Sequence, residues 1–350
     1  MKDSGKLRFA MFGAAYWARF QLSAWKELEG AECVAIYNRT RSKGEKFAQD
    51  FGIPAVYDDP EELLEKEKPD FVDIVTNPFT FNHFVKLVAA HKIPVISQKP
   101  MAPSLAIAQD NIRACRQAGV PYLIHENWRW QAPLRALREV LDSGVIGTPF
   151  RARISMVSCY PVFINEPHIA DLEDFILTDM GTHILDIARF FFGEAQQLYC
   201  QIHQVHPDVK GEDVATVMMH MGAKTTVTCE MGYPQNYMEN DYFPETLIYV
   251  EADKGTAEVA RDYWVRVTTE SGTDARRHPP VQYPWADPDH VVVQSSIVPC
   301  NANLLAALRG EGIAETTAED NYKTLELVYA AYDSARNCRM IKFGNQFMVW

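Results

Sequence analysis

Short apolar runs alternate with helical patterns through the first 127 residues of the chain. The apolar runs cover residues 7–12, 33–37, 55–57, 71–76, 94–97 and 121–125. The helical patterns cover residues 14–28, 42–51, 81–91 and 104–118, the last with Ser104 as its candidate N-cap. Strands that alternate with helices predict an α/β domain with a parallel sheet and right-handed crossovers. Ligands in such sheets bind at the carboxyl ends of the strands.

The turn after the first run reads Gly13-Ala-Ala-Tyr-Trp-Ala18, a degraded dinucleotide-binding fingerprint. Gly13 supplies the tight turn, whereas Ala15 replaces the glycine over which a pyrophosphate passes. The N-terminus of the next helix still presents free N–H groups to a phosphate. We therefore expect Gly13, Ala15, Tyr16 and Trp17 to contact a dinucleotide.

The second run ends in Tyr37-Asn-Arg-Thr-Arg41, without the acidic residue that an NAD-preferring site often places on the ribose. Asn38 can still hydrogen-bond a ribose, and Arg39 or Arg41 could meet a 2′-phosphate. This composition leans toward NADP or toward use of both cofactors. The alternative is that both arginines are solvated turn residues.

The chain has 350 residues, 47% of them hydrophobic, which is long for a single core and suggests two domains, 1–127 and 128–350. A net charge of −12 argues against nucleic acid or an anionic membrane as a partner. No run of about 18 apolar residues is visible, so we expect no membrane span. The first seven residues carry charges and no apolar region, so we expect no secretory signal.

Seven cysteines are scattered without a Cys-x-x-Cys pair, as expected for reduced core thiols of a cytoplasmic protein. His203 and His206 are spaced as metal ligands can be, but no third ligand accompanies them. We interpret both as outward residues of a strand and expect no metal site.

The second half reads as strands joined by short polar turns, several of them alternating apolar and polar residues. These strands cover residues 150–159, 197–206, 216–221, 225–231, 246–250, 256–260 and 263–269. Residues 272–298 form a long segment rich in Pro, Asp and His, typical of a functional loop or an oligomer arm.

Asp179, His183 and Asp186 stand at spacings of four and three within residues 177–191. On a helix these side chains lie along one face, next to an apolar stripe. A carboxylate can fix the tautomer of a histidine and stabilise its protonated form, as a general base requires. The simpler alternative is a polar helix face that meets solvent. Lys99, at the end of an earlier strand, favours the catalytic interpretation.

With these motifs in place, the chain resembles the glucose–fructose oxidoreductase/inositol dehydrogenase (Gfo/Idh/MocA) family over nearly its whole length. The motifs that match are the Gly-rich turn, Gln98-Lys99-Pro100 in place of Glu-Lys-Pro, Asp179-x-x-x-His183, and a closing helix and strand at 317–343. The resemblance implies a Rossmann domain followed by an α+β domain with a large, open, mostly antiparallel sheet. It also implies a homo-oligomer, a dimer or tetramer, that covers the open face.

The resemblance implies roles for individual residues in an NAD(P)-dependent oxidation of a sugar or polyol hydroxyl. His183 would take the hydroxyl proton, Asp179 would orient His183, and Lys99 would hold the oxygen as negative charge develops. Thr76, Asn77 and Gln98 would line the ribose or the nicotinamide.

The segment His125-Glu-Asn-Trp-Arg-Trp-Gln131 suits a polyol, with Asn127 and Arg129 as the expected substrate contacts. The alternative is that Trp128 and Trp130 are ordinary core anchors, which we favour for at least one of them. Tyr160, Asn165 and His168 are further substrate candidates. Residues 98–103 and 125–131 resemble those of family members that oxidise D-apiose at its anomeric carbon to a lactone.

Three other interpretations compete with a sugar dehydrogenase. A reductase of a non-sugar ring would share the cofactor site but need not keep Asp179 and His183 beside Lys99. A non-catalytic NAD(P)-sensing regulator would be indicated by loss of Lys99 or His183, and both are present. A simple binding module would need neither two domains nor these three residues.

Overall fold

The computed structural model describes residues 5–160, 162–164, 167–222, 224–234, 238 and 241–344. The chain forms two compact units. The first contains residues 1–127, 284–286 and 297–323, and the second contains residues 128–283, 287–296 and 324–350, as far as these are described. The first unit thus includes residues 297–323, which the sequence had assigned to the second domain.

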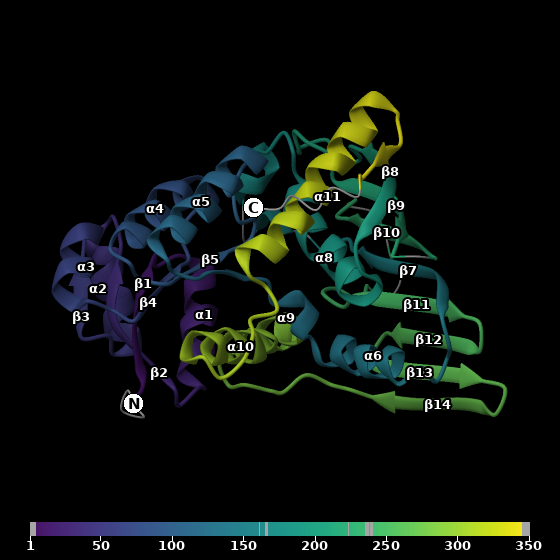
Figure 1. Ribbon diagram of the computed structural model, residues 1–350, viewed down its shortest axis with the longest axis horizontal. Coiled ribbons are helices and arrows are strands. Elements are labelled where there is room, and N and C mark those ends of the chain that lie inside the picture. Colours follow the sequence, from purple (N-terminus) through teal and green to yellow (C-terminus); the bar gives the residue numbers. More distant parts are fainter. Residues whose placement is uncertain are drawn as a thin grey trace. The chain divides into compact units, whose positions relative to one another are not determined.

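The first unit is built on a parallel sheet with the strand order β3-β2-β1-β4-β5-β6 (Figure 1). Its strands are β1 (Leu7–Phe12), β2 (Ala31–Tyr37), β3 (Ala55–Tyr57), β4 (Phe71–Ile74), β5 (Val95–Gln98) and β6 (Tyr122–His125). This is the order of a dinucleotide-binding Rossmann fold, so the predicted α/β class is confirmed. The carboxyl ends of β1 and β4 lie side by side at the point where the strand order reverses.

Some helices of the first unit begin or end at capping residues that the sequence contains. They are α1 (Tyr16–Lys26), α2 (Arg41–Phe51), α3 (Pro60–Glu67), α4 (Phe81–Ala90), α5 (Leu105–Ala118) and α10 (Ile297–Arg309), with the short 3-10 turn η1 (Pro78–Thr80) before α4. Ser104 Oγ accepts a hydrogen bond from Ile107 N at 3.3 Å, which confirms the predicted N-cap. Gly52 and Gly119 end α2 and α5 in the left-handed conformation that favours glycine.

The core of the first unit contains one buried carboxylate. Asp73 on β4 is fully buried, and its Oδ2 accepts hydrogen bonds from Trp25 Nε1 at 2.7 Å and Gln21 Nε2 at 2.8 Å. Burial disfavours the charged carboxylate and raises the pKa of Asp73 to about 6. The two hydrogen bonds oppose this shift but do not cancel it.

The second unit is built on a sheet with the order β14-β13-β12-β11-β7-β10-β9-β8-β15 among the described residues. Its strands are β7 (Pro149–Val157), β8 (Ala195–His203), β9 (Val214–Met221), β10 (Thr225–Gly232), β11 (Leu247–Ala252), β12 (Gly255–Ala260), β13 (Trp264–Thr269), β14 (Gly272–Arg277) and β15 (Ile341–Lys342). Only β7 and β10 pair in parallel within this described sheet, so the predicted mostly antiparallel fold is confirmed.

The two faces of this sheet differ in chemistry. One face is apolar and buried, with Ile154, Val217 and Cys229 at its centre, and the helices α6 (Ala132–Ser143) and α8 (Gly181–Phe192) pack on this sheet (Figure 1). The opposite face carries ion pairs, because residues one position along each strand point the other way. These pairs are Arg151–Glu251, Arg153–Glu230 and Arg266–Glu258.

The prediction of a long loop at residues 272–298 is wrong. The segment contains β14, a 3-10 turn η5 (Pro288–His290), α9 (Val291–Ser295) and the start of α10. Every residue of β14 is exposed, so neither face of the strand requires apolar side chains. Its sequence therefore lacks the alternation of apolar and polar residues by which a strand is recognised. The predicted closing helix and strand are present as α11 (Ala318–Asn337) and β15.

Two predictions from composition need correction. By length and composition the helical stretch Pro288–Arg309 is apolar enough to cross a membrane, and 67% of its most apolar window is buried inside the protein, as in a core helix. The sequence analysis missed it because polar residues interrupt its apolar runs. All seven cysteines are free, but Cys338 is exposed rather than a core thiol.

Candidate functional site

Gly13 lies in the turn between β1 and α1, where there is no room for a side chain. Its φ is +108°, and a Cβ placed there would lie 2.7 Å from Val75 O and 3.1 Å from Thr76 Cγ2. Gly13 N also donates to Tyr37 O at 2.8 Å, so the turn contacts the ends of both β2 and β4. Ala15, the N-cap of α1, is exposed and makes no side-chain cap bond, and no acidic residue lies in the first turn. The first N–H groups of α1 therefore suit an anionic ligand.

Two buried donors near these strand ends have no partner within the described chain. They are Gln98 Nε2, at the end of β5, and Trp17 Nε1, in the first turn of α1. A buried donor without a partner costs free energy, so both atoms fit contact with a polar ligand. Together with the space at Gly13, they show that the residues present fit a dinucleotide. Lys99, half-buried, follows Gln98 directly.

Thr76 and Asn77 follow β4 and bind mainly to their own loop. Thr76 Oγ1 lies 2.8 Å from Thr80 Oγ1, and Asn77 Oδ1 accepts from Phe79 N at 3.0 Å. These bonds lie within the loop and start η1. The side-chain oxygen of Asn77 is thus used as a cap, which leaves its amide nitrogen for a ligand.

The end of β2 carries the expected polar side chains and one acid that the sequence analysis missed. Asn38 Nδ2 donates to Thr40 O at 2.8 Å, which shapes the turn. Arg41 is held by Glu45 at 3.1 Å and by Asp58 at 3.3 Å, whereas Arg39 is exposed. Asp58 follows β3 and is brought here because β3 pairs with β2. A residue from a neighbouring strand is invisible to a search along β2 alone.

In the second unit, the predicted single helix at residues 177–191 is wrong in detail. Helix α7 (Ile176–Asp179) ends at Asp179, and α8 begins at Gly181. Met180 between them keeps right-handed helical angles. His183 is 4% exposed and Asp186 is fully buried, so the alternative of a solvated polar face is also wrong.

Trp128, in the 3-10 turn η2 (Trp128–Trp130), stacks on His183. The ring centroids are 4.1 Å apart and the planes are inclined by 24°. Trp128 Nε1 donates to Thr246 Oγ1 at 2.9 Å, and both residues are buried. The imidazole therefore has one face covered by an indole that is itself anchored.

Arg129 makes a bidentate ion pair with Asp186. Arg129 Nε and Nη2 donate to the two Asp186 oxygens at 2.8 and 2.6 Å, and both side chains are buried. Asp186 Oδ1 also accepts from Thr324 Oγ1 at 3.1 Å. This arrangement favours a role for Arg129 in holding α8, and its predicted contact with substrate stays a prediction. Asn127 is buried, at the end of the first unit.

Tyr160 belongs to an aromatic cluster that the sequence analysis only partly found. Its ring stacks on Phe243 at 4.1 Å with an angle of 1°, and His290 contacts both rings edge-on at 5.4 and 5.3 Å. His290 comes from a segment that gave no motif, so no local signal marked it. Asn165 lies outside the described residues, and the side chain of His168 is not described.

Of the two histidines considered as metal ligands, His206 does not lie where the sequence predicts. His203 is exposed at the end of β8, but His206 is buried beyond the strand, where Nδ1 accepts from Asp208 N at 3.1 Å. In the described part of the chain, no group of three His, Cys, Asp or Glu side chains is gathered as a metal site requires.

Comparison with known proteins identifies one family in both halves of the chain. A model of the GFO/IDH/MocA oxidoreductase family, with an NAD-binding Rossmann fold, matches residues 7–126, and the GFO/IDH/MocA C-terminal domain matches residues 134–258. The chain is 37% identical over 340 residues to a D-apiose dehydrogenase of Rhizobium rhizogenes, covering 97% of this chain and 98% of the relative. It is 37% identical over 339 residues to that of Paraburkholderia graminis, covering 96% and 90%.

The fold has a close match among solved structures. An oxidoreductase from Agrobacterium radiobacter, crystallised with NAD⁺, L-tartaric acid and magnesium, superposes with a TM-score of 0.94 at 37% identity, covering 96% of this chain and 98% of that one. The predicted family, enzyme class and nicotinamide cofactor are thereby confirmed. The chain belongs to the Gfo/Idh/MocA family of oxidoreductases, with an NAD-binding Rossmann fold in its first unit.

Proposed function

We propose that the chain is an NAD(P)-dependent sugar dehydrogenase that oxidises an aldose, D-apiose or a near relative, at its anomeric carbon to the lactone. One observation carries the proposal. In a protein of this family, the His183 side chain on α8 is buried, and the anchored ring of Trp128 stacks on it. The identity of the sugar is supported by the two D-apiose dehydrogenases that match nearly the whole chain.

Oxidation of a carbinol removes a hydride from carbon and a proton from oxygen. The bound nicotinamide supplies the acceptor for the hydride. His183 takes the hydroxyl proton as general base, and Asp179 orients the imidazole. The Lys99 ammonium holds the same oxygen and stabilises the negative charge that develops on it.

The cofactor would be held by the strand ends of the first unit. Gly13, Ala15 and the first N–H groups of α1 would face the pyrophosphate, with Tyr16 and Trp17 beside it. Asn38 and Arg39 would face the adenosine ribose, and Thr76, Asn77 and Gln98 the nicotinamide half. The buried, unpartnered Gln98 Nε2 supports this placement. Asn127, Arg129 and Tyr160 remain the proposed sugar contacts.

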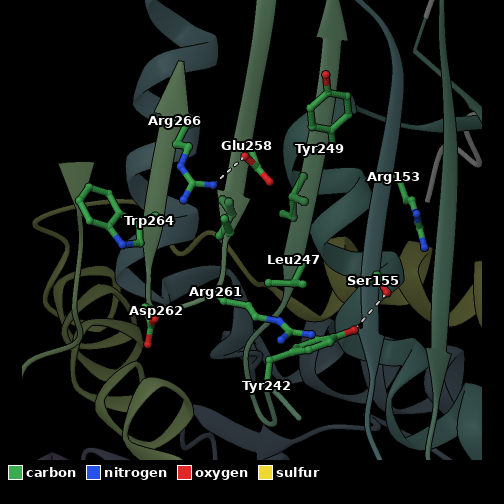
Figure 2. Close-up of a pocket in the computed structure, with 13 residues that line it drawn as sticks. Arg153, Ser155, Tyr242, Leu247, Tyr249, Glu258, Arg261, Asp262, Trp264 and Arg266 are labelled. Carbon is green, nitrogen blue, oxygen red and sulfur yellow. Dashed lines mark hydrogen bonds and ion pairs between the residues drawn. The ribbon is translucent and has the colours of Figure 1, made fainter. Parts of the chain in front are cut away.

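The polar face of the second sheet supports a homo-oligomer, a dimer or tetramer. A hollow of about 550 Å³ lies on this sheet. Figure 2 shows Tyr249, Trp264 and Arg266 among the side chains that line it, with Arg261 lying toward Tyr242. Tyr249 and Met218 are 45% and 48% exposed on neighbouring parts of this face. Aromatic side chains and arginines of this kind are enriched where proteins meet. Tyr249→Asp should lower the mass measured by light scattering if a second copy covers this face.

We also place the protein in the cytoplasm as a small-molecule enzyme without nucleic-acid or membrane partners. The seven cysteines support a reducing compartment, because none forms a disulfide within the described chain. Expression with a fluorescent tag and cell fractionation would test the location.

The function is tested by following the reduction of NAD and NADP with D-apiose, other aldoses, ketoses and inositols. D-Apiose should give the highest kcat/KM, and the lactone should appear in an NMR spectrum of the product. Higher kcat/KM with an inositol or a ketose would overturn the anomeric oxidation. No turnover with any of these compounds would overturn the sugar dehydrogenase.

A further inference from the structure

The turn η2 contacts α8 through two consecutive residues. Trp128 stacks on His183, and Arg129 forms its buried ion pair with Asp186, three residues farther along the same helix. Residues at this spacing lie on neighbouring positions of one helix face. The two contacts therefore fix η2 and α8 to each other at two points, which restricts both the rotation of the helix and the plane of the imidazole.

The indole has a second anchor outside η2. Thr246, immediately before β11, accepts the Trp128 Nε1 hydrogen bond at 2.9 Å, and its side chain is shielded from solvent. A buried indole N–H requires such a partner, so the alternative orientation of the ring is disfavoured. Strand β11 is thus connected to His183 through one hydrogen bond and one ring stack.

We propose that Trp128 is a positioning residue for the reaction, which holds the His183 imidazole in one plane and favours its protonated form, and that Thr246 sets the orientation of Trp128. The inference rests on the proposed role of His183 as general base. It assigns to Trp128 a function beyond a core anchor, and to Thr246 an indirect one.

The electrostatic part follows from the face of the indole ring. An aromatic face attracts a cation, so a stacked indole stabilises imidazolium relative to neutral imidazole. Other charged and titratable groups on the described elements packed against α8 are Arg129 on η2, Asp179 on α7, Cys229 and Glu230 on β10, and Arg151 and Arg153 on β7. Arg151, Arg153 and Glu230 form ion pairs on the opposite face of the sheet. On α8 itself the charged groups are Asp186 and the buried Arg189, which forms an ion pair with Glu194. Arg129 and Asp186 largely neutralise each other, whereas Asp179 adds to the effect of the indole.

The experiment compares four variants of the full-length enzyme with wild type across a pH series. Trp128→Leu removes the stack, Trp128→Phe keeps a ring but loses the N–H, and Thr246→Val removes only the acceptor. Thr225→Val is the matched control, because Thr225 is also a buried threonine whose hydroxyl bonds in the same sheet, to Pro149 O at 3.0 Å.

Trp128→Leu should lower kcat about 10-fold with KM changed less than about 2-fold, because a misplaced base costs transition-state rather than ground-state binding. The acidic limb of the kcat profile should move down by about half to one pH unit, since the indole no longer favours imidazolium. Trp128→Phe and Thr246→Val should lie between Trp128→Leu and wild type, with losses of about 3-fold. Thr225→Val should match wild type in both measures.

Different outcomes separate this inference from the proposed function. If His183→Ala keeps wild-type turnover, His183 is not the base and the function itself is overturned. If His183→Ala is inactive but the Trp128 and Thr246 variants match Thr225→Val, only the positioning role is overturned. A Trp128→Leu variant with raised KM, unchanged kcat and a fixed acidic limb would mean that the indole contacts the sugar instead. If Trp128→Leu fails to fold, the same criteria apply to Trp128→Phe and Thr246→Val.

Discussion

The two sheets differ in how their faces are buried. In the first unit the proposed cofactor-binding residues lie at strand ends, whereas in the second unit His183 lies on a helix that packs on the sheet. In the first sheet, β4, β5 and β6 are buried at every residue, so helices cover both faces and polar ligands can approach only at strand ends. In the second sheet, β9 alternates between buried and more exposed residues. One face packs on the helix that carries His183, and the other remains polar.

The polar groups differ in the same way. In the first unit, Gln98 Nε2 and Trp17 Nε1 are buried without a partner in the described chain, as in a site that a ligand completes. In the second unit, Trp128 and Arg129 already have partners in Thr246 and Asp186. Ligand binding would therefore complete the polar contacts of the first unit, whereas His183, the proposed base, is already positioned by contacts within the second unit.

The largest expected effect tests whether each unit contributes a reacting group. Lys99→Ala and His183→Ala should each lower kcat by about 10²-fold or more, because each removes a group that we propose acts on the hydroxyl in the transition state. Steady-state kinetics gives kcat, and quenching of tryptophan fluorescence by NADH checks that the cofactor still binds. Wild-type turnover in Lys99→Ala would confine the chemistry to the second unit.

The stability of the second unit should depend on the buried ion pair between Arg129 and Asp186. Arg129→Met leaves Asp186 buried without its bidentate partner and should lower the free energy of unfolding by about 3–5 kcal/mol. Urea denaturation followed by fluorescence measures this change. The double variant Arg129→Met/Asp186→Leu should recover most of the loss, because neither charge of this pair remains and the buried Arg189 keeps its ion pair with Glu194. An unchanged midpoint in Arg129→Met would show that the pair is not a restraint on α8.

The buried carboxylate of the first unit gives a pH-dependent test. The pKa of Asp73 is raised from 3.8 to about 6, so the folded state retains the proton where the unfolded state has lost it. This group therefore makes stability fall as pH rises from about 4 to about 6, with a full cost of about 3 kcal/mol above that range. Asp73→Asn lacks this cost and keeps an acceptor for Trp25.

The measurement is the free energy of unfolding of both proteins at pH 4 and pH 7. The advantage of Asp73→Asn over wild type should grow by about 2 kcal/mol between these values, because part of the cost is already present at pH 4. Asp110→Asn, which removes a carboxylate from the surface, is the control and should follow wild type. Equal pH dependence in Asp73→Asn and wild type would contradict a charged, desolvated Asp73.

The smallest expected effect concerns the edge of the first sheet. Asn38→Asp adds a carboxylate that accepts from ribose hydroxyls and repels a 2′-phosphate. The ratio of kcat/KM for NAD over NADP should rise about 10-fold, as for one charge-assisted contact of about 1.4 kcal/mol. Asp58→Asn should move the ratio the other way, because it releases Arg41 toward the phosphate. If the ratio of kcat/KM for NAD over NADP is unchanged in Asn38→Asp, this turn is not the ribose site.

The strands and helices of the first unit were largely predictable because the sequence carries their signals locally. Apolar runs, Gly13 and the Ser104 cap each act within a few residues. In the second unit the alternating strands were found, but β14 was not, because an edge strand exposed along its length needs no apolar alternation. The break between α7 and α8 was also missed, since Met180 keeps helical angles and marks no boundary in the sequence.

The sequence by itself determined the fold class and most of the strands, and it singled out Lys99, Asp179 and His183 as the proposed reacting residues. Only the tertiary structure decided which side chains meet. It brought Trp128 and Thr246 to His183, paired Arg129 with Asp186, and carried Asp58 to the end of β2. These contacts join residues far apart in the chain, and they depend on strand pairing and helix packing rather than on any local preference.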